Sequence, residues 1–284
     1  MDIIDSSEMI LNPDGSIYHL GLKPGDLAPI IITVGDPDRV PMVSKYFDEI
    51  FLQVHRRELV THSGRIGKQN VSVVSTGMGT DNIDIVFNEI DALFNIDFET
   101  RTIQKDITSL KIIRLGTSGA IHHDIPLDTI LASELAIGYD GLLGFYDIAP
   151  HRFSDFKVPN LGDNKGYIVP GSELLLNTIG KDYIKGVTYT AAGFFAPQGR
   201  ILRANVTLPD ILNQLLSIQL PDQRKITNIE METSGLYGLG HALEHEVISI
   251  SALIANRIDG TFSKNPEETV IRMIEESLAK IENL

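Results

Sequence analysis

The sequence predicts one α/β domain, built as a three-layer α/β/α sandwich around a mixed β-sheet. Segments typical of strands alternate with segments typical of helices along the chain. Several strand segments are apolar at every position, which indicates a sheet covered by helices on both faces. No linker rich in Pro, Gly or Ser divides the 284 residues. We therefore expect a loose N-terminal arm over residues 1–16 and one domain over residues 17–284.

Patterns of apolar and turn residues locate the expected elements in order. β-Branched residues predict a buried strand over 29–34, directly before a Gly-Asp-Pro-Asp turn. Similar patterns predict strands over 51–59, 70–75, 110–116, 128–136 and 186–193, a short strand ending at Ile229, and an apolar strand over 247–256. Helices are predicted over 82–94, where apolar residues recur at helical spacing, over 232–244, and from Pro266 to the C-terminus.

Composition excludes several classes of protein. Hydrophobic residues make up 43% of the chain and charged residues 22%, as in an ordinary soluble globular protein. The chain has no cysteine, which excludes disulfides and thiolate zinc sites. A formal net charge of -14 argues against a nucleic-acid partner, because phosphates are neutralised by Lys and Arg. Neither a signal peptide nor a membrane-length apolar run is visible, so we expect a cytoplasmic protein with no membrane partner.

Unusual polar residues follow several predicted strands, where α/β proteins bind ligands. They occur in the segments Gly35–Arg39 (GDPDR), Arg114–Ser118 (RLGTS), Phe194–Arg200 (FFAPQGR) and Glu230–Glu232 (EME). Arginines beside a Gly/Thr/Ser loop suit an oxyanion such as phosphate. A carboxylate where a strand meets a helix suits sugar hydroxyls, and an aromatic face with Gln and Arg suits a flat heterocycle that bears carbonyls. Arg114 requires a partner in any case, because arginine is almost never fully buried without one.

Each of these segments also has a purely structural interpretation. The Gly-Asp-Pro-Asp segment is typical of a turn capped by aspartates. Glu230 and Glu232 are acids that a helix dipole would stabilise. The glycines of residues 235–240 do not follow the dinucleotide-binding order and are more typical of helix packing. The two histidines of residues 241–245 lie one helical turn apart, but without a visible third metal ligand they favour a solvated helix face.

Short motifs in a fixed order point to a known family. From Tyr18 to the C-terminus the chain carries YHLGL, GDPDRV, HRRE, STGMG, IIRLGTSGAI, PQGR, NIEMET and IANR. In these motifs and their order the chain resembles the nucleoside phosphorylase type-I family, and in particular its uridine branch. Purine-handling relatives place an aspartate after the last apolar strand, where this chain has Asn256 and Arg257. A neutral amide cannot serve as the acid that protonates a purine.

The resemblance implies a role for each residue that matches a family motif. The phosphate-binding positions are Gly35, Arg39, Arg57, Arg114 and Thr117. The resemblance implies that Arg57 reaches the phosphate of a neighbouring subunit. The ribose-binding positions are His19, Met231 and Glu232. The resemblance implies that His19 crosses the dimer interface to the 5′-hydroxyl and that Glu232 binds the 2′- and 3′-hydroxyls. The base-binding positions are Phe194, Gln198 and Arg200, and the catalytic positions are Arg114, Gln198, Arg200 and Arg257.

These roles imply reversible phosphorolysis of uridine to uracil and ribose 1-phosphate, with deoxyuridine and thymidine as further candidate substrates. Inorganic phosphate is the co-substrate, and no metal or organic cofactor is expected. Glu58 matches a residue that binds a monovalent cation such as potassium in some members, but Asn82 stands where a serine is expected beside it. We expect a homodimer at least, and a higher homo-oligomer built from it, with sites shared across the dimer interface.

Other functions remain open at this point. A purine nucleoside phosphorylase or a nucleosidase of the same family would share most of the motifs. A non-catalytic nucleoside-binding protein would share the binding residues. The segment 95–111 is longer than in compact bacterial members, so a hexamer does not follow from the resemblance.

Overall fold

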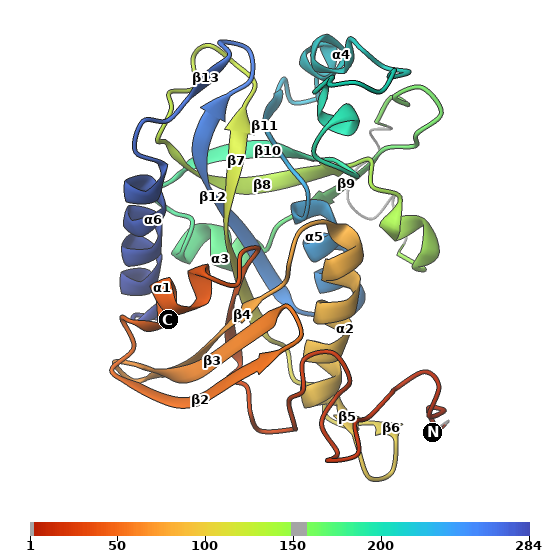
Figure 1. The fold of residues 1–284 in the computed structure, drawn as a ribbon, viewed down its shortest axis with the longest axis vertical. Coiled ribbons are helices and arrows are strands. Elements are labelled where there is room, and N and C mark those ends of the chain that lie inside the picture. The colour runs from red at the N-terminus through yellow and green to blue at the C-terminus, as the bar shows by residue number, and fades with distance from the viewer. Residues whose placement is uncertain (1–2, 149–157) are drawn as a thin grey trace.

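The computed structural model describes residues 3–148 and 158–284 (Figure 1). It confirms the predicted fold class, since helices lie on both sides of an 11-stranded mixed sheet. The sheet strands are β1 (Ile30–Val34), β2 (Glu49–Arg56), β3 (Leu59–Ile66), β4 (Gln69–Ser75), β7 (Lys111–Ala120), β8 (Ile130–Gly138), β9 (Tyr167–Pro170), β10 (Ile184–Thr190), β11 (Ile226–Glu230), β12 (Glu246–Asn256) and β13 (Thr261–Phe262). A separate hairpin pairs β5 (Ile96–Asp97) with β6 (Thr102–Ile103).

The helices form the two outer layers. They are α1 (Arg39–Ser44), α2 (Thr80–Asn95), α3 (Glu173–Thr178), α4 (Ile211–Ser217), α5 (Thr233–Ala242) and α6 (Pro266–Ile281), with short 3-10 turns η1 (Leu142–Phe145) and η3 (Ala196–Gln198). Residues of α1, α3 and α6 share one apolar cluster with the sheet, and residues of α2 and α5 share another. Figure 1 shows α6 and α2 on opposite sides of the central strands.

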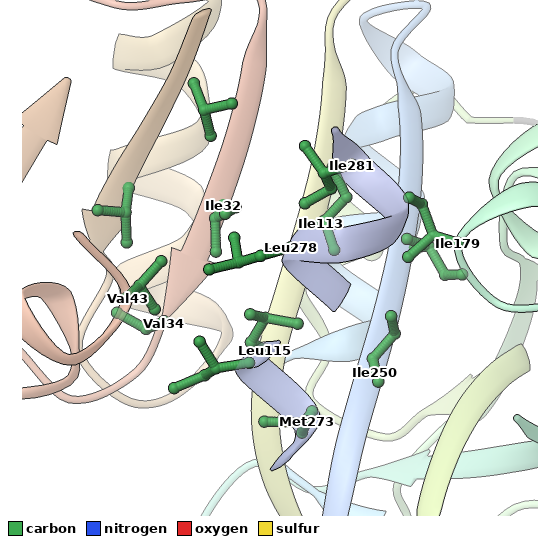
Figure 2. Packing of buried hydrophobic residues seen from close by; sticks show 14 of the residues in the cluster. Ile32, Val34, Val43, Ile113, Leu115, Ile179, Ile250, Met273, Leu278 and Ile281 are labelled. Atoms are coloured by element: carbon green, nitrogen blue, oxygen red, sulfur yellow. The ribbon is translucent and has the colours of Figure 1, made fainter. Parts of the chain in front are cut away.

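Strand β1 explains why the central strands are largely apolar on both faces. Ile32 and Val34 belong to the cluster beneath α6, where Met273 and Leu278 also lie (Figure 2). Ile31 points the other way and belongs to the cluster beneath α2. Because successive side chains of a strand face opposite sides, a strand covered on both sides has no solvent-facing position.

The sheet also closes on itself in one half. Its order is β13-β12-β8-β10-β11-β7-β1-β4-β3-β2, with β9 paired to β8. Strand β12 pairs with β8 and also runs parallel to β7 over most of its length. The strands β12, β8, β10, β11 and β7 therefore form a closed ring, which the predicted open sandwich did not include.

Several local predictions are corrected by the structure. The single strand expected over 51–59 is wrong, because a turn at Arg57 and Glu58 separates β2 from β3. Arg57 takes a left-handed conformation there, with φ at 54°. The sequence patterns also do not predict the short elements α1, α3, α4 and β9. In the described part of the arm, the carbonyls of Ile4 and Asp5 accept hydrogen bonds from the Arg101 side chain, while its expected looseness stays a prediction.

The glycine-rich segment of α5 packs as the helix-packing interpretation predicts. A Cβ atom at Gly238 would overlap the Leu143 side chain, so the glycine makes room for the contact between α5 and η1. In the parts of the chain that the structure describes, no helix has both the length and the apolar character needed to cross a membrane.

Candidate functional site

Parallel pairing places the carboxyl end of β1 beside the middle of β7, which continues to Ala120. Thr33 on β1 lies beside Arg114 on β7, so the Gly35 turn begins level with the Gly116 segment. Arg39 opens α1 just after this turn, and its Nη1 donates to the Leu115 carbonyl at 3.2 Å. The predicted phosphate-binding residues of β1, α1 and β7 therefore lie together, with Thr117 partly buried further along β7.

Arg114 is buried and paired with two carboxylates. Its Nη2 contacts Glu232 in a direct ion pair and lies 3.6 Å from Glu230 Oε2. All three side chains are at most 6% exposed. Among the described residues, Arg114 Nη1 is buried and has no hydrogen-bond partner. A further anion could therefore bind there without displacing an existing contact of that nitrogen.

Gly116 makes room for the Arg114 guanidinium. A Cβ atom at position 116 would overlap Nη1 and crowd the rest of the guanidinium group. The glycine two residues after the arginine therefore lets the Arg114 side chain extend over position 116 along β7.

The sequence indicates only a structural role for Glu230, but the structure places its carboxylate beside Arg114. It accepts from the backbone N–H of Glu232 at 3.0 Å, from the Thr233 N–H at 2.9 Å and from the Thr190 hydroxyl at 2.7 Å. Burial nevertheless raises the pKa of the Glu230 carboxyl to about 7, against the opposing effect of Arg114. The signal in the sequence was the Glu-Met-Glu segment itself, since a buried arginine needs an acid.

Glu232 connects the arginine cluster with the glycine turn that follows β4. Its Oε1 accepts from the Gly79 N–H at 2.9 Å, while its other oxygen meets Arg114. The Met231 Cε atom lies 3.9 Å from the position of a Cβ atom at Gly79. Both predicted ribose residues of this chain segment thus line the same turn.

A second group of predicted residues lies beyond β10. The Arg200 guanidinium carbon lies 3.7 Å from the centroid of the Phe194 ring, and its Nη1 donates to Gln198 Oε1 at 2.5 Å. Arg257 Nη1 donates to the Gln198 carbonyl at 3.0 Å. The structure therefore brings Phe194, Gln198, Arg200 and Arg257 together, although Arg257 follows a different strand. Phe194 is 51% exposed, so its ring remains accessible beside Arg200.

Strand pairing links the two groups. Strand β10 runs parallel to β11, with Thr190 beside Glu230, so the segments that follow both strands leave the same edge. Strand β11 in turn pairs with β7, and the Arg257 side chain packs against Gly119 of β7. We call the whole arrangement the strand-end site: the Arg39–Arg114–Glu232 cluster and the Phe194–Gln198–Arg200–Arg257 group.

Burial makes the guanidinium groups of the site strong hydrogen-bond donors toward anions. Burial, and then the charge of Arg114, lowers the pKa of Arg39. Burial, and then the charge of Arg257, lowers the pKa of Arg200 to about 10. Each arginine stays charged at neutral pH, but its charge is only partly solvated. A bound anion would relieve that cost, which favours anionic ligands or groups that gain negative charge.

His19 and Arg57 lie in a cluster of their own. His19 Nδ1 is 2.6 Å from Glu89 Oε1, and its ring packs edge-on against Tyr18. The Arg57 guanidinium lies over the same Tyr18 ring, 4.8 Å from its centroid. Within the described ranges, the contacts of both residues run to this cluster and not to the strand-end site. One chain alone does not bring them to Arg114.

In the part of the chain that the structure describes, the histidines and acids form no metal centre. No group of three or more His, Cys, Asp or Glu residues among residues 3–148 and 158–284 could hold a metal ion. Glu58 is exposed at the turn after β2, and its proposed cation site stays a prediction. The expected solvated face for the histidines of 241–245 is wrong for His245, whose side chain is buried with Nε2 3.2 Å from Asp91 Oδ1.

The fold and the strand-end site define a class: three-layer α/β proteins that bury a cluster of arginines and carboxylates against a mixed sheet. Within that class the chain belongs to the phosphorylase superfamily, whose family model matches residues 29–284. The resemblance drawn from the motifs is thereby confirmed.

Comparison with individual proteins supports the same family. The chain is 27% identical to a uridine phosphorylase of Thermococcus kodakarensis over 275 residues, which cover 96% of this chain and 89% of that protein. It is 25% identical to a DeoD-type purine nucleoside phosphorylase of Lactococcus lactis, over 88% of this chain and 90% of the relative. The crystal structure of a Trypanosoma brucei nucleoside phosphorylase, described as showing uridine phosphorylase activity, matches with a TM-score of 0.83 and 28% identity. That match covers 95% of this chain and 99% of the other.

Proposed function

We propose that the protein is a uridine phosphorylase. The observation that carries the proposal is the buried Arg114–Glu232 pair, which the pairing of β7, β11 and β10 links to a group of Gln and Arg donors. The related uridine phosphorylases and the structural neighbour with that activity support it. Deoxyuridine and thymidine are further candidate substrates.

The proposed reaction starts with phosphate held by Arg39 and Arg114. Arg114 Nη1 offers the buried, unpartnered donors that a phosphate oxygen requires. Positioned below C1′ of the nucleoside, a phosphate oxygen forms the new bond to C1′ while the bond from C1′ to the uracil N1 breaks. Glu232 accepts hydrogen bonds from the 2′- and 3′-hydroxyls. The exchange involves no oxidation or reduction, so no organic cofactor is part of the proposal.

The base leaves with the electron pair of the broken bond. Negative charge spreads over the uracil ring and its carbonyl oxygens as the bond to C1′ lengthens. Gln198 and Arg200, supported by Arg257, donate hydrogen bonds where that charge develops, and partly desolvated donors stabilise it most. Phe194 supplies the apolar face on which the ring packs.

The co-substrate gives the direct test of this proposal. Uracil release from uridine is expected to require phosphate or arsenate, because the arginines hold an anionic nucleophile. The measurement is uracil formation with and without phosphate, with inosine and methylthioadenosine run in parallel. Release of free ribose at the same rate in phosphate-free buffer would identify a hydrolase instead. Faster turnover of inosine than of uridine would identify a purine enzyme, and uridine binding without turnover would identify a binding protein.

We also propose that two chains share each active site, in a homodimer or a larger homo-oligomer. The support is the separation of His19 and Arg57 from the strand-end site in one chain. A mixture of His19→Ala and Glu232→Gln chains is expected to regain activity after subunit exchange, because hybrid dimers contain one intact site. Exchange is followed by native mass spectrometry. Confirmed exchange with no regained activity would show that each site is built from one chain.

A further inference from the structure

The β5–β6 hairpin holds the N-terminal segment through one residue, Arg101. Arg101 Nε donates to the Ile4 carbonyl at 2.8 Å, and its Nη2 donates to the carbonyls of Asp5, at 2.9 Å, and of Met9. In the other direction, the Ile4 N–H donates to the Arg101 carbonyl at 2.8 Å. Figure 1 shows the hairpin beside the start of the chain. One side chain thus makes several of the contacts that hold the start of the described arm.

The hairpin is itself fixed to the end of α2. The Gln104 N–H donates to the Asn95 carbonyl at 2.7 Å, and the Thr108 N–H donates to Asn95 Oδ1 at 2.8 Å. Asn95 Nδ2 returns a hydrogen bond to the Thr108 carbonyl at 3.2 Å. Because Asn95 is buried, these bonds tie the whole 95–108 segment to the helix.

The same helix also holds His19, two turns nearer its start. Glu89 of α2 accepts from the backbone N–H groups of His19, at 2.9 Å, and of Leu20, at 2.8 Å. Its Oε1 also meets His19 Nδ1 at 2.6 Å. Helix α2 therefore fixes both ends of the segment from Ile4 to Leu20, one end through Arg101 and the other through Glu89.

Between those ends the segment forms a connected turn. Asn12 Nδ2 donates to the Ser16 hydroxyl at 3.0 Å and to the Ile17 carbonyl at 2.9 Å. Arg56 of β2 donates to Asn12 Oδ1 at 3.1 Å. Met9 is buried, which leaves little freedom to the first half of the turn. A change at Arg101 is thus transmitted to His19 through contacts, not through a flexible linker.

We propose that Arg101 is a positioning residue for His19, so that the long 95–108 segment serves substrate binding from a distance. This inference rests on the proposed function, in which His19 contacts the ribose 5′-hydroxyl in a neighbouring subunit. Loss of the Arg101 bonds lets the arm detach and lowers the fraction of molecules in which His19 is correctly placed. The effect is confined to substrates that carry the 5′-hydroxyl.

The experiment compares uridine with 5′-deoxyuridine, which lacks that hydroxyl. Arg101→Ala is expected to lower kcat/KM for uridine by about 3- to 10-fold, the contribution of one hydrogen bond, and to leave 5′-deoxyuridine unchanged. In a His19→Ala background the same change is expected to have no further effect. Amide hydrogen exchange over residues 4–16 is expected to be faster in Arg101→Ala. The matched control is Arg65→Ala, a partly exposed arginine of β3 whose acidic partners are exposed and which also donates to the Gly67 carbonyl.

The outcomes separate the two claims. If His19→Ala lowers the ratio of uridine to 5′-deoxyuridine kcat/KM and Arg101→Ala does not, the positioning role is overturned while the proposed function stands. If His19→Ala itself leaves the ratio unchanged, the proposed role of His19 fails and the positioning role fails with it. An equal loss on both substrates in Arg101→Ala would mark a general structural effect and overturn the positioning role.

Discussion

An Arg114→Met variant is expected to be about 3–5 kcal/mol less stable than the wild-type protein. Glu230 and Glu232 lie buried on either side of the guanidinium, and methionine fills the space without neutralising them. Turnover is expected to fall by at least roughly 100- to 1000-fold, because the phosphate loses a charged donor. Urea unfolding and steady-state kinetics at saturating uridine measure the two effects.

The stability loss in Arg114→Met is expected to depend on pH. The pKa of the Glu230 carboxyl is raised by burial to about 7 even with Arg114 present, and the variant lacks the charge that opposes burial. A carboxyl whose folded pKa is raised loses stabilisation as pH increases through that pKa. The loss is therefore smaller at pH 5, where the carboxyl is protonated, than at pH 8.

Arg65→Met provides the comparison for this variant. Arg65 has acidic partners at 3.7 and 3.9 Å, but all of these side chains are exposed, and such pairs contribute about 0–1 kcal/mol. An Arg114→Met protein as stable and as active as Arg65→Met would contradict the assignment of Arg114 to both the buried cluster and the phosphate.

Arg200→Ala is expected to lower turnover of uridine by roughly 100- to 1000-fold, or about 2.7–4 kcal/mol. Arg200 only donates hydrogen bonds, so it favours the carbonyl at position 4 of uracil over the amino group of cytosine. The variant is therefore expected to lose the preference for uridine over cytidine. Affinity for phosphate changes little, because the contacts of Arg200 run to Phe194 and Gln198 and not to the Arg39–Arg114 cluster.

Two further variants sharpen this test. Arg203→Ala removes an exposed arginine from the same loop and is expected to leave turnover and base preference unchanged. Phe194→Leu is expected to weaken nucleoside binding without altering the choice between uridine and cytidine, because ring packing tolerates different bases. Full turnover together with an intact uridine preference in Arg200→Ala would show that this side chain does not face the base.

The long elements could be predicted because their periodicity extends over many residues. Helix α6 repeats apolar residues along one face, and β1 is apolar on both faces, so each pattern admits one structure. The turn at Arg57 carries none of the usual Gly, Pro or Asn signals, which is why β2 and β3 were predicted as one strand. Helices as short as α1, α3 and α4 offer too few residues for a periodic pattern.

The sequence predicts which residues belong to the candidate site, but not which of them are in contact. Glu232 and the turn before Arg39 follow strands as predicted, but Arg114 lies inside β7, because that strand continues to Ala120 and does not end at Gly116. The ion pair between Arg114 and Glu232 joins residues 118 positions apart, and only the strand order brings them together. For the same reason, the pairing of Glu230 with Arg114 and the contact between Arg257 and Gln198 could be seen only in the structure.

Position 116 limits how this protein family member can evolve. A substitution there inserts a side chain into the volume of the Arg114 guanidinium, whatever the new residue is. Glycine at position 116 is therefore required for as long as the Arg114 side chain keeps this conformation. The order of change matters, because replacing Arg114 first would empty that volume and remove the steric constraint on position 116.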